Sequence, residues 1–289
     1  MVQEFFDTHC HVHELEAALT PVHDKWQSDG AERTATEVLR AARKVGVNRI
    51  IVVGTTLEDS DLAVRFAQDH ENVWASVGLH PHEAKNYTKQ QKPTSRGLSS
   101  QNDITVVLPE IARRIGELVR EPKVVAVGEC GLDYYYEHSP KADQEAVLRF
   151  QIDLALEHNL PLSFHVREAF DDFWRIFDSY HGIRGVLHSF TDSQINMERA
   201  IERGLYIGVN GIATFTKNEA QIVTYCTIPQ QRLLLETDAP FLTPKPFRGK
   251  ICEPKHVVDT AECLAELRGI NLTDLAAVST TNAKQLFNL

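Results

Sequence analysis

The sequence contains few cysteines, no long apolar run and no excess of basic residues. Its five cysteines are odd in number and include no CxxC pair, so neither a disulfide framework nor a zinc knuckle is indicated. No run of about 18 apolar residues predicts a membrane span, and the first residues lack the basic and apolar regions of a secretory signal. We therefore expect reduced thiols, no membrane association and a cytoplasmic location.

The charge balance limits how the protein can bind nucleic acid. Lys and Arg number 30 and Asp and Glu 40, which gives a net charge of −10. This balance excludes binding through a generally basic surface, because neutralising many phosphates requires a basic face. It does not exclude a metal site that binds one phosphate at a time, since a bound cation can be the largest local charge.

Eight short runs rich in Val, Ile and Leu alternate with segments of helical spacing. Such alternation indicates right-handed crossovers and a parallel sheet. Eight units in 289 residues predict an α/β protein with one domain, a closed (β/α)8 TIM barrel over residues 1–289. An open doubly wound sheet competes, but the Gly-rich dinucleotide motif that would favour it is absent. The predicted strands are 4–11, 49–56, 73–80, 124–132, 161–167, 185–190, 205–212 and 233–240.

Two segments are longer than a simple barrel needs. Residues 20–35 lie between the first strand and its helix, and residues 85–103 follow the third strand. The second segment is polar and contains a proline, a glycine and several serines. We expect both to be loop insertions on the C-terminal face of the barrel.

Histidines and carboxylates gather where the predicted strands end. In an extended strand alternate side chains share a face, so His9 and His11 would point toward one small object. Solvated polar residues explain any single case, but six of the eight strands carry such a residue at the end where barrels place catalytic groups. The set suits Zn, Mn or Mg. It exceeds the needs of one tetrahedral zinc, which favours two ions about 3.5–4 Å apart. The candidate ligands are His9, His11, Glu129, His165, His188 and Asp238.

A series of motifs around these residues runs in order along almost the whole chain. They are DTHCH at 7–11, VGLHPH at 77–82, VGECGLDYYY at 127–136, FHVRE at 164–168, GVLHSF at 185–190, GIATF at 211–215, LLLETDAPFLTP at 233–244 and PFRGK at 246–250. Together they resemble the TatD family of metal-dependent hydrolases, in the amidohydrolase-like group of barrels. Any one of these motifs is weak, but several in one order are highly specific.

The resemblance implies a role for each matched residue. It implies two divalent ions, bridged by Glu129, and it leaves Zn, Mn and Mg open. Asp238 would also accept a proton from the attacking water, and His80 would lie near the substrate as a further catalytic residue. The implied ligands are His9, His11 and Asp238 for one ion, and His165 and His188 for the other.

The family is associated with metal-dependent deoxyribonuclease activity, including 3′-to-5′ exonuclease action, and some members resemble D-aminoacyl-tRNA deacylases. The resemblance therefore implies cleavage of DNA phosphodiester bonds, with single-stranded DNA or 3′ ends as the partner, and it indicates no obligate protein partner. Another amidohydrolase-type ester or amide hydrolase is the alternative. Branches that bridge their ions with a carboxylated Lys are disfavoured, because Glu129 occupies that position. The complete ligand set argues against a non-catalytic nucleic-acid-binding barrel.

Four residues near the expected site are candidates for substrate binding. Arg167 follows the fifth-strand histidine by two residues, and Arg248 and Lys250 lie in the loop after the last strand. Cations at the mouth of a metal site in an acidic protein favour phosphate or carboxylate contacts over plain surface charge. Tyr134 begins a run of three tyrosines that could stack on a base or pack the loop. Cys252 stands where the family usually shows an Asn, which puts one polar substrate contact in doubt.

Overall fold

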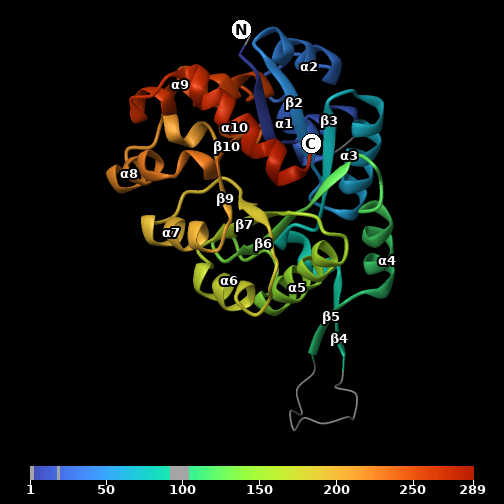
Figure 1. Ribbon diagram of the computed structural model, residues 1–289. Helices are drawn as coiled ribbons and strands as arrows, with labels where there is room; N and C mark the ends of the chain where they lie inside the picture. The colour runs from blue at the N-terminus through green and yellow to red at the C-terminus, as the bar shows by residue number, and fades with distance from the viewer. Residues whose placement is uncertain (1–2, 18–19, 92–103) are drawn as a thin grey trace.

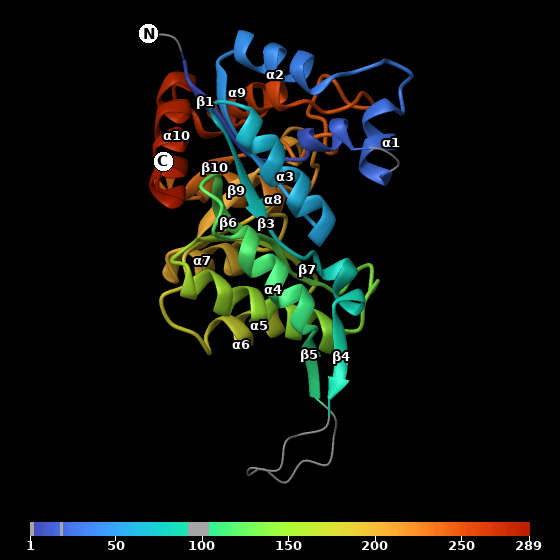
Figure 2. The ribbon, with the colours of Figure 1, turned by 90° about the vertical axis from the view of Figure 1, so that its right-hand side faces the viewer.

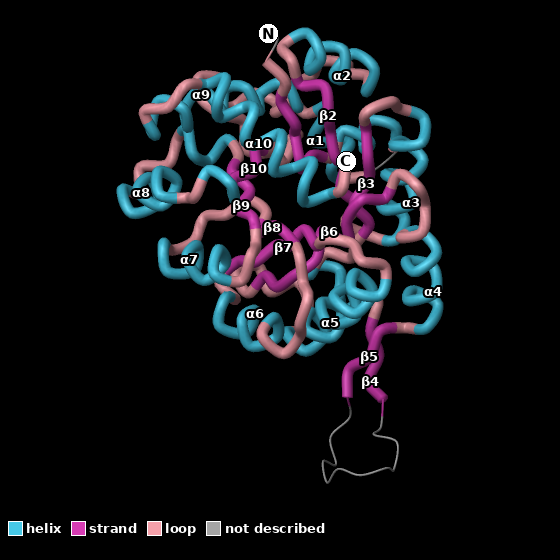
Figure 3. Tube along the Cα trace, viewed as in Figure 1, coloured by secondary structure: helices cyan, strands magenta, loops and turns pink. Residues whose placement is uncertain are grey.

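The computed structural model describes residues 3–17, 20–91 and 104–289. Eight parallel strands form one sheet in their order along the chain, and the helices surround it (Figure 1, Figure 3). This arrangement confirms the predicted (β/α)8 barrel. Its strands are β1 (Phe5–Cys10), β2 (Val47–Val53), β3 (Val73–Val77), β6 (Val124–Asp133), β7 (Leu162–Arg167), β8 (Gly185–Leu187), β9 (Tyr206–Val209) and β10 (Leu233–Leu235).

The helices begin at caps that the sequence supplies. Thr34 and Thr56 each accept a hydrogen bond from the backbone N–H three residues further on, which starts α2 and α3. Asn271 caps α10, whose Leu286 lies in one apolar cluster with Phe6 of β1, so α10 packs against the N-terminal end of the barrel. None of the described helices has the length and apolar character needed to cross a bilayer. The helices are α2 (Ala35–Lys44), α3 (Leu57–Asp69), α4 (Pro109–Leu118), α5 (Lys141–Glu157), α6 (Phe170–Phe177), α7 (Gln194–Glu202), α8 (Glu219–Thr227), α9 (Val257–Arg268) and α10 (Leu272–Phe287).

The barrel is closed between β1 and β10 by a short seam. One parallel bridge joins Cys10 to Ala239, and the His11 N–H donates to the Ala239 carbonyl at 2.8 Å. The buried Asp7 carboxylate adds to the seam, because it accepts the Thr237 N–H at 2.9 Å and the Thr237 hydroxyl at 2.6 Å. Burial raises the pKa of Asp7 to about 8, although these donors act in the opposite direction. A side chain therefore supplies part of the bonding that a longer strand pair would provide.

The two insertions differ in structure. Residues 20–35 contain the short helix α1 (Pro21–Gln27), whose Trp26 is fully buried and donates its indole N–H to the His11 carbonyl at 3.0 Å. After β3, β4 (Thr88–Gln91) pairs with β5 (Ile104–Val107) as an antiparallel hairpin that projects from the barrel (Figure 2). Residues 88–91 thus form a strand where a loop was expected. Residues 92–103 of that expected loop lie outside the described residues.

The seam between β1 and β10 can be tested with Thr237→Val. The valine keeps the shape of the side chain but leaves an Asp7 oxygen without its hydroxyl donor in a buried site. We expect a loss of about 1–3 kcal/mol in the free energy of unfolding, measured from the shift of the urea midpoint. Thr281→Val on the exposed face of α10 is the control and should change stability by less than about 0.5 kcal/mol. Equal midpoints for the two variants would show that the seam does not depend on this hydrogen bond.

Candidate active site

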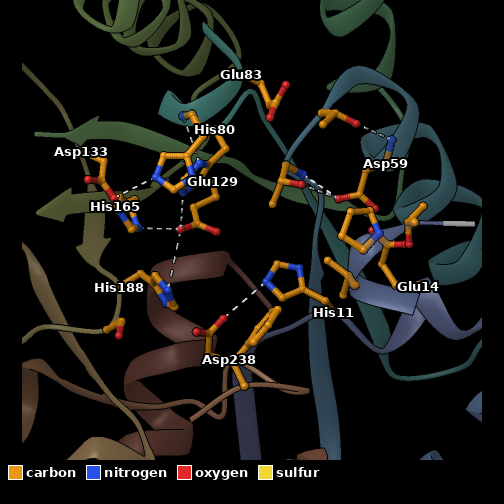
Figure 4. A pocket seen from close by; sticks show the side chains of 18 of the residues that line it. His11, Glu14, Asp59, His80, Glu83, Glu129, Asp133, His165, His188 and Asp238 are labelled. Carbon is orange, nitrogen blue, oxygen red and sulfur yellow. Dashed lines mark hydrogen bonds and ion pairs between the residues drawn. The ribbon is translucent and has the colours of Figure 1, made fainter. Parts of the chain in front are cut away.

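The six predicted ligands meet at the C-terminal end of the barrel, and Figure 4 shows five of them, with Glu129 between His11, His165, His188 and Asp238. One carboxylate oxygen of Glu129 lies 3.0 Å from Nδ1 of His165 and 3.8 Å from Nε2 of His188. The other oxygen lies 3.4 Å from Nε2 of His9. Asp238 stands beside this cluster, with an oxygen 3.4 Å from Nε2 of His11 and 3.9 Å from Nε2 of His9. Residues from five strand ends therefore converge on one small volume.

Irregular strand register turns two of these side chains inward. The pairing of β1 with β2 shifts between Asp7 and Cys10, and the pairing of β6 with β7 shifts between Val127 and Cys130. The first shift includes His9 and the second includes Glu129, both predicted ligands. Gly128 within the second shift has a φ of +144°, and a Cβ there would lie 2.5 Å from the Ser163 carbonyl oxygen, so only glycine fits. Cys10 and Cys130 pack in the large core cluster of the helix layer, as strand alternation predicts.

The electrostatics of the cluster are those of a cation site. Burial alone would raise the pKa of Glu129, but the surrounding histidines, His80 and His188 first, hold it well below its usual range. Burial lowers the pKa of His188, yet Glu236 and Glu129 outweigh it and raise the pKa to about 10. Burial dominates at His80 and lowers its pKa to about 4, so that imidazole is neutral near pH 7. The buried carboxylates thus stay ionised and require positive charge beside them.

The donor set fits divalent metal ions. Among the described residues, Nε2 of His9 is a buried atom that faces Glu129 and lacks a hydrogen-bond partner. Buried polar atoms without partners are costly unless another group binds them. Three groups of residues have ligand atoms within 4.8 Å of one another: His9, His11 and Glu129; His80, Glu129 and His165; and His9, His188 and Glu236.

A second layer of residues orients the histidines. Asp133 is fully buried and accepts from Nε2 of His165 at 2.9 Å and from Nε2 of His82 at 3.0 Å. With the proton on Nε2, the Nδ1 lone pair of His165 faces Glu129. In the same way Nδ1 of His11 bonds the Val53 carbonyl at 2.9 Å, which leaves its Nε2 toward Asp238. Motif matching alone did not single out Asp133 for this role.

Glu236 holds His188 from the far side. Its carboxylate lies 3.0 Å from Nδ1 of His188 and accepts the Ser189 N–H at 2.6 Å. Strand parity with Asp238 predicts that Glu236 points inward, and the structure places it there, fully buried. Space for the carboxylate exists because the facing residue on β9 is Gly208, where a Cβ would lie 2.3 Å from a Glu236 oxygen.

The predicted substrate residues do not all reach the pocket. Arg167 lines it, with its guanidinium 4.0 Å from the ring centre of Tyr135. Tyr134 is outside the set of residues that line the pocket, because its hydroxyl donates to Asp172 and its ring packs under Lys141. Arg248 and Lys250 also lie outside that set. Arg248 packs over the Phe215 ring at 3.7 Å and donates to the Thr243 carbonyl, and Lys250 lies 5.6 Å from the ring centre of Phe247.

The pocket is a cavity of about 1370 Å³ with two unlike sides. Figure 4 shows Glu14 and Asp59 across from Asp133 and His165, with Glu129 between them. His13, which follows the predicted ligands His9 and His11 in the sequence, does not reach Glu129 and the histidines around it but bonds Asp59 at 2.7 Å. Sequence patterns gave no sign of this side, because its residues come from separate loops and helices. We call this side, formed by Glu14 and Asp59, the acidic wall. Three further carboxylates also line the pocket: Glu16, Glu58 and Glu83.

Comparisons with known proteins identify the family of the chain. The chain matches the family described as TatD related DNase over residues 6–288. It is 34% identical over 286 residues to the uncharacterized metal-dependent hydrolase YabD of Bacillus subtilis, a match that covers 98% of this chain and 99% of that protein. It is 31% identical over 261 residues to the 3′-5′ ssDNA/RNA exonuclease TatD of Escherichia coli, which covers 88% of this chain and 92% of that one.

Solved structures give the same picture of the fold. The TatD homologue YjjV of Escherichia coli superposes with a TM-score of 0.80 at 26% identity and covers 100% of both chains. A TatD family hydrolase of Entamoeba histolytica superposes with a TM-score of 0.77 at 21% identity, with 99% of each chain covered.

The role of Glu236 can be tested with Gly208→Ala. The added methyl group would displace the Glu236 carboxylate and with it the support of His188. We expect the affinity for a divalent ion such as Mn²⁺ to fall about 10- to 100-fold in a calorimetric titration, as is typical when a residue that supports a ligand is lost. Gly116→Ala is the control, because a Cβ at that position of α4 meets open space. Parent-like affinity of the Gly208→Ala protein would remove Glu236 from the metal site.

Proposed function

The chain belongs to the TatD family and is a metal-dependent hydrolase, and from this premise we propose that it is a deoxyribonuclease. In this proposal it removes nucleotides from the 3′ ends of single-stranded DNA. The observation that carries the proposal is the convergence of four histidines and Asp238 around Glu129 in a pocket that also holds Arg167. The printed name of the Escherichia coli relative, an ssDNA/RNA exonuclease, supports the choice of substrate.

Two divalent ions would occupy the cluster. Glu129 has one oxygen toward His9 and the other toward His165, so it is placed to bridge them. When bound, such ions lower the pKa of a water and neutralise charge on the phosphate oxygens. Overlapping groups of ligand atoms that share Glu129 favour a pair over a single ion. The proposed ligands are His9, His11 and Asp238 for one ion, His165 and His188 for the other, and Glu129 for both.

Asp238 is the proposed proton acceptor. Burial would raise its pKa, but His11 and His188 keep the pKa below its usual value, so the carboxylate is ionised and can accept a proton at neutral pH. Its place beside His9 and His11, two proposed ligands, supports this role. His80 is neutral and 3.4 Å from Glu129, so it can donate a hydrogen bond to a phosphate oxygen without bringing a charge of its own.

Arg167 is the proposed anchor for a phosphate next to the cleaved bond. It lines the pocket two residues beyond His165 and forms no ion pair with the carboxylates of the described residues. A guanidinium free of carboxylate partners in a protein of net charge −10 is available for an anionic substrate. We propose Arg248 and Lys250, which lie outside the pocket lining, as outer contacts for phosphates further along the strand.

A second candidate is the deacylation of a D-aminoacyl-tRNA. The acidic wall favours it, because several carboxylates beside the pocket could bind the α-ammonium group of an amino acid. A substrate panel on metal-reconstituted protein separates the two functions: single-stranded DNA, double-stranded DNA, RNA and D-aminoacyl-tRNA. We expect mononucleotides to be released fastest from single-stranded DNA. Deacylation without nucleotide release would overturn the nuclease proposal and favour the second candidate.

Asp238→Asn tests the proton acceptor. The amide keeps the shape and a metal-binding oxygen but cannot take the proton, so kcat on single-stranded DNA should fall about 10²- to 10⁴-fold at saturating metal. Metal content by elemental analysis on the same sample separates loss of the base from loss of an ion. Asp171→Asn, an exposed position on α6, is the control and should keep parent activity. If Asp238→Asn keeps near-parent kcat, another group accepts the proton, and His80 is the next candidate.

Arg248→Ala tests the outer phosphate contact. We expect a raised KM on DNA and a smaller dependence of affinity on salt, because one fewer counterion is released on binding. Arg120→Ala, an exposed arginine just after α4, removes the same charge far from the pocket and should behave as the parent. Unchanged kinetics across a salt series would place Arg248 outside the substrate path.

A further inference from the structure

Two exposed tyrosines lie beside Arg167, and one of them, Tyr136, lines the pocket together with it. Tyr135 is 52% exposed and Tyr136 is 50% exposed, although neighbouring aromatic residues such as Phe164 are buried in the core. The Arg167 guanidinium lies 4.0 Å from the ring centre of Tyr135 and 4.7 Å from that of Tyr136. The two rings are nearly perpendicular to each other, at 88°, and the guanidinium lies over one face of each. We call Tyr135, Tyr136 and Arg167 the aromatic platform.

One side chain, Asp133, links the aromatic platform to the histidines around Glu129. The Asp133 carboxylate accepts the backbone N–H groups of Tyr135 at 3.0 Å and of Tyr136 at 2.9 Å. The same carboxylate accepts from His165 at 2.9 Å. The loop that carries the tyrosines is therefore held at a set position relative to His165, a predicted ligand.

Further aromatic groups extend the aromatic platform into the pocket. The ring of His82 meets Tyr136 edge-on with centres 5.4 Å apart, and His138 stacks parallel to Tyr136 at 5.6 Å with an angle of 9°. His82 and Tyr136 both line the pocket. Flat rings in this arrangement suit contact with another flat ring.

The distribution of charge in the pocket favours the approach of a nucleic acid strand along the aromatic platform. Arg167 is its cation, whereas the opposite side of the pocket is the acidic wall, which repels phosphates. The other arginine of the lining, Arg65, is already paired with Asp61 at 2.9 Å. Charge therefore favours the entry of a nucleic acid strand along the side of Arg167. A nucleotide there would bring a phosphate to the guanidinium and a base to the tyrosine rings, a combination typical of sites for single strands.

We propose that the aromatic platform is a stacking subsite for the unpaired base of the nucleotide next to the cleaved bond. This inference rests on the proposed nuclease function and adds the feature that selects single strands. In a duplex the bases are paired and stacked on each other, so none can lie on Tyr136 until the end unpairs. Stacking accepts any base, and the aromatic platform therefore selects strandedness rather than sequence.

Substrates with and without bases test the proposal. Two single-stranded oligonucleotides of equal length are compared, one normal and one whose last three 3′ nucleotides carry a tetrahydrofuran in place of the base. For the parent protein we expect kcat/KM to be about 5- to 100-fold lower on the abasic strand. Tyr136→Ala should show a similar loss on the normal strand and no further loss on the abasic strand. Tyr136→Phe should keep parent behaviour, because stacking needs the ring and not the hydroxyl.

Controls separate this inference from the nuclease proposal. Ile195→Ala, a 64% exposed apolar position on α7 away from the pocket, should leave both strands unaffected. The affinities of the two fluorescently labelled strands for Asp238→Asn protein measure the contribution of the aromatic platform to binding without cleavage. The normal strand should bind more tightly than the abasic strand by a similar factor. If the parent cleaves no DNA, the nuclease proposal fails. If both strands bind and react equally in parent and Tyr136→Ala proteins, the stacking subsite is overturned whatever the parent cleaves.

Discussion

The contact between the buried Glu129 carboxylate and the histidines around it is the interaction on which the site depends. Its two oxygens lie within 3.0–3.8 Å of His9, His80, His165 and His188, which come from four different strand ends. A buried carboxylate is costly unless positive charge compensates it, and within residues 3–17, 20–91 and 104–289 only histidines form ion pairs with Glu129. The site is thus built to hold cationic charge, from protonated imidazoles or from metal ions. Because the protein is acidic overall, this cationic charge would attract phosphate only locally.

The fold serves this contact in several ways. Closure of the barrel through Asp7 and Thr237 brings the last strand, with Asp238, next to the first. Shifts in register in β1 and β6 turn His9 and Glu129 inward while the adjoining cysteines pack outward. Asp133 and Glu236 then orient His165 and His188 from behind. Because each support acts on a different ligand, loss of one should weaken the site without unfolding the barrel.

The sequence predicted the barrel and the meeting point of the ligands because both follow from local patterns. Alternating strands and helices imply the barrel, and histidines at strand ends share its C-terminal face. Other features depend on contacts between distant residues. The strand at 88–91 was missed because its pairing partner follows a long polar segment. Tyr134 was chosen from its motif, yet its hydroxyl bonds Asp172, and the exposed rings belong to Tyr135 and Tyr136. The acidic wall could not be predicted, because its residues lie in separate segments and no sequence pattern connects them.

The central claim is that Glu129 stands between two metal ions. Crystals grown with Mn²⁺ and measured at a wavelength where manganese scatters anomalously would locate each ion directly. The account predicts two anomalous peaks about 3.5–4 Å apart, one beside His9, His11 and Asp238 and one beside His165 and His188, with Glu129 touching both. Glu129→Gln crystals should lose at least one of the peaks. A single peak in the parent protein, or peaks that Glu129 does not touch, would contradict the account.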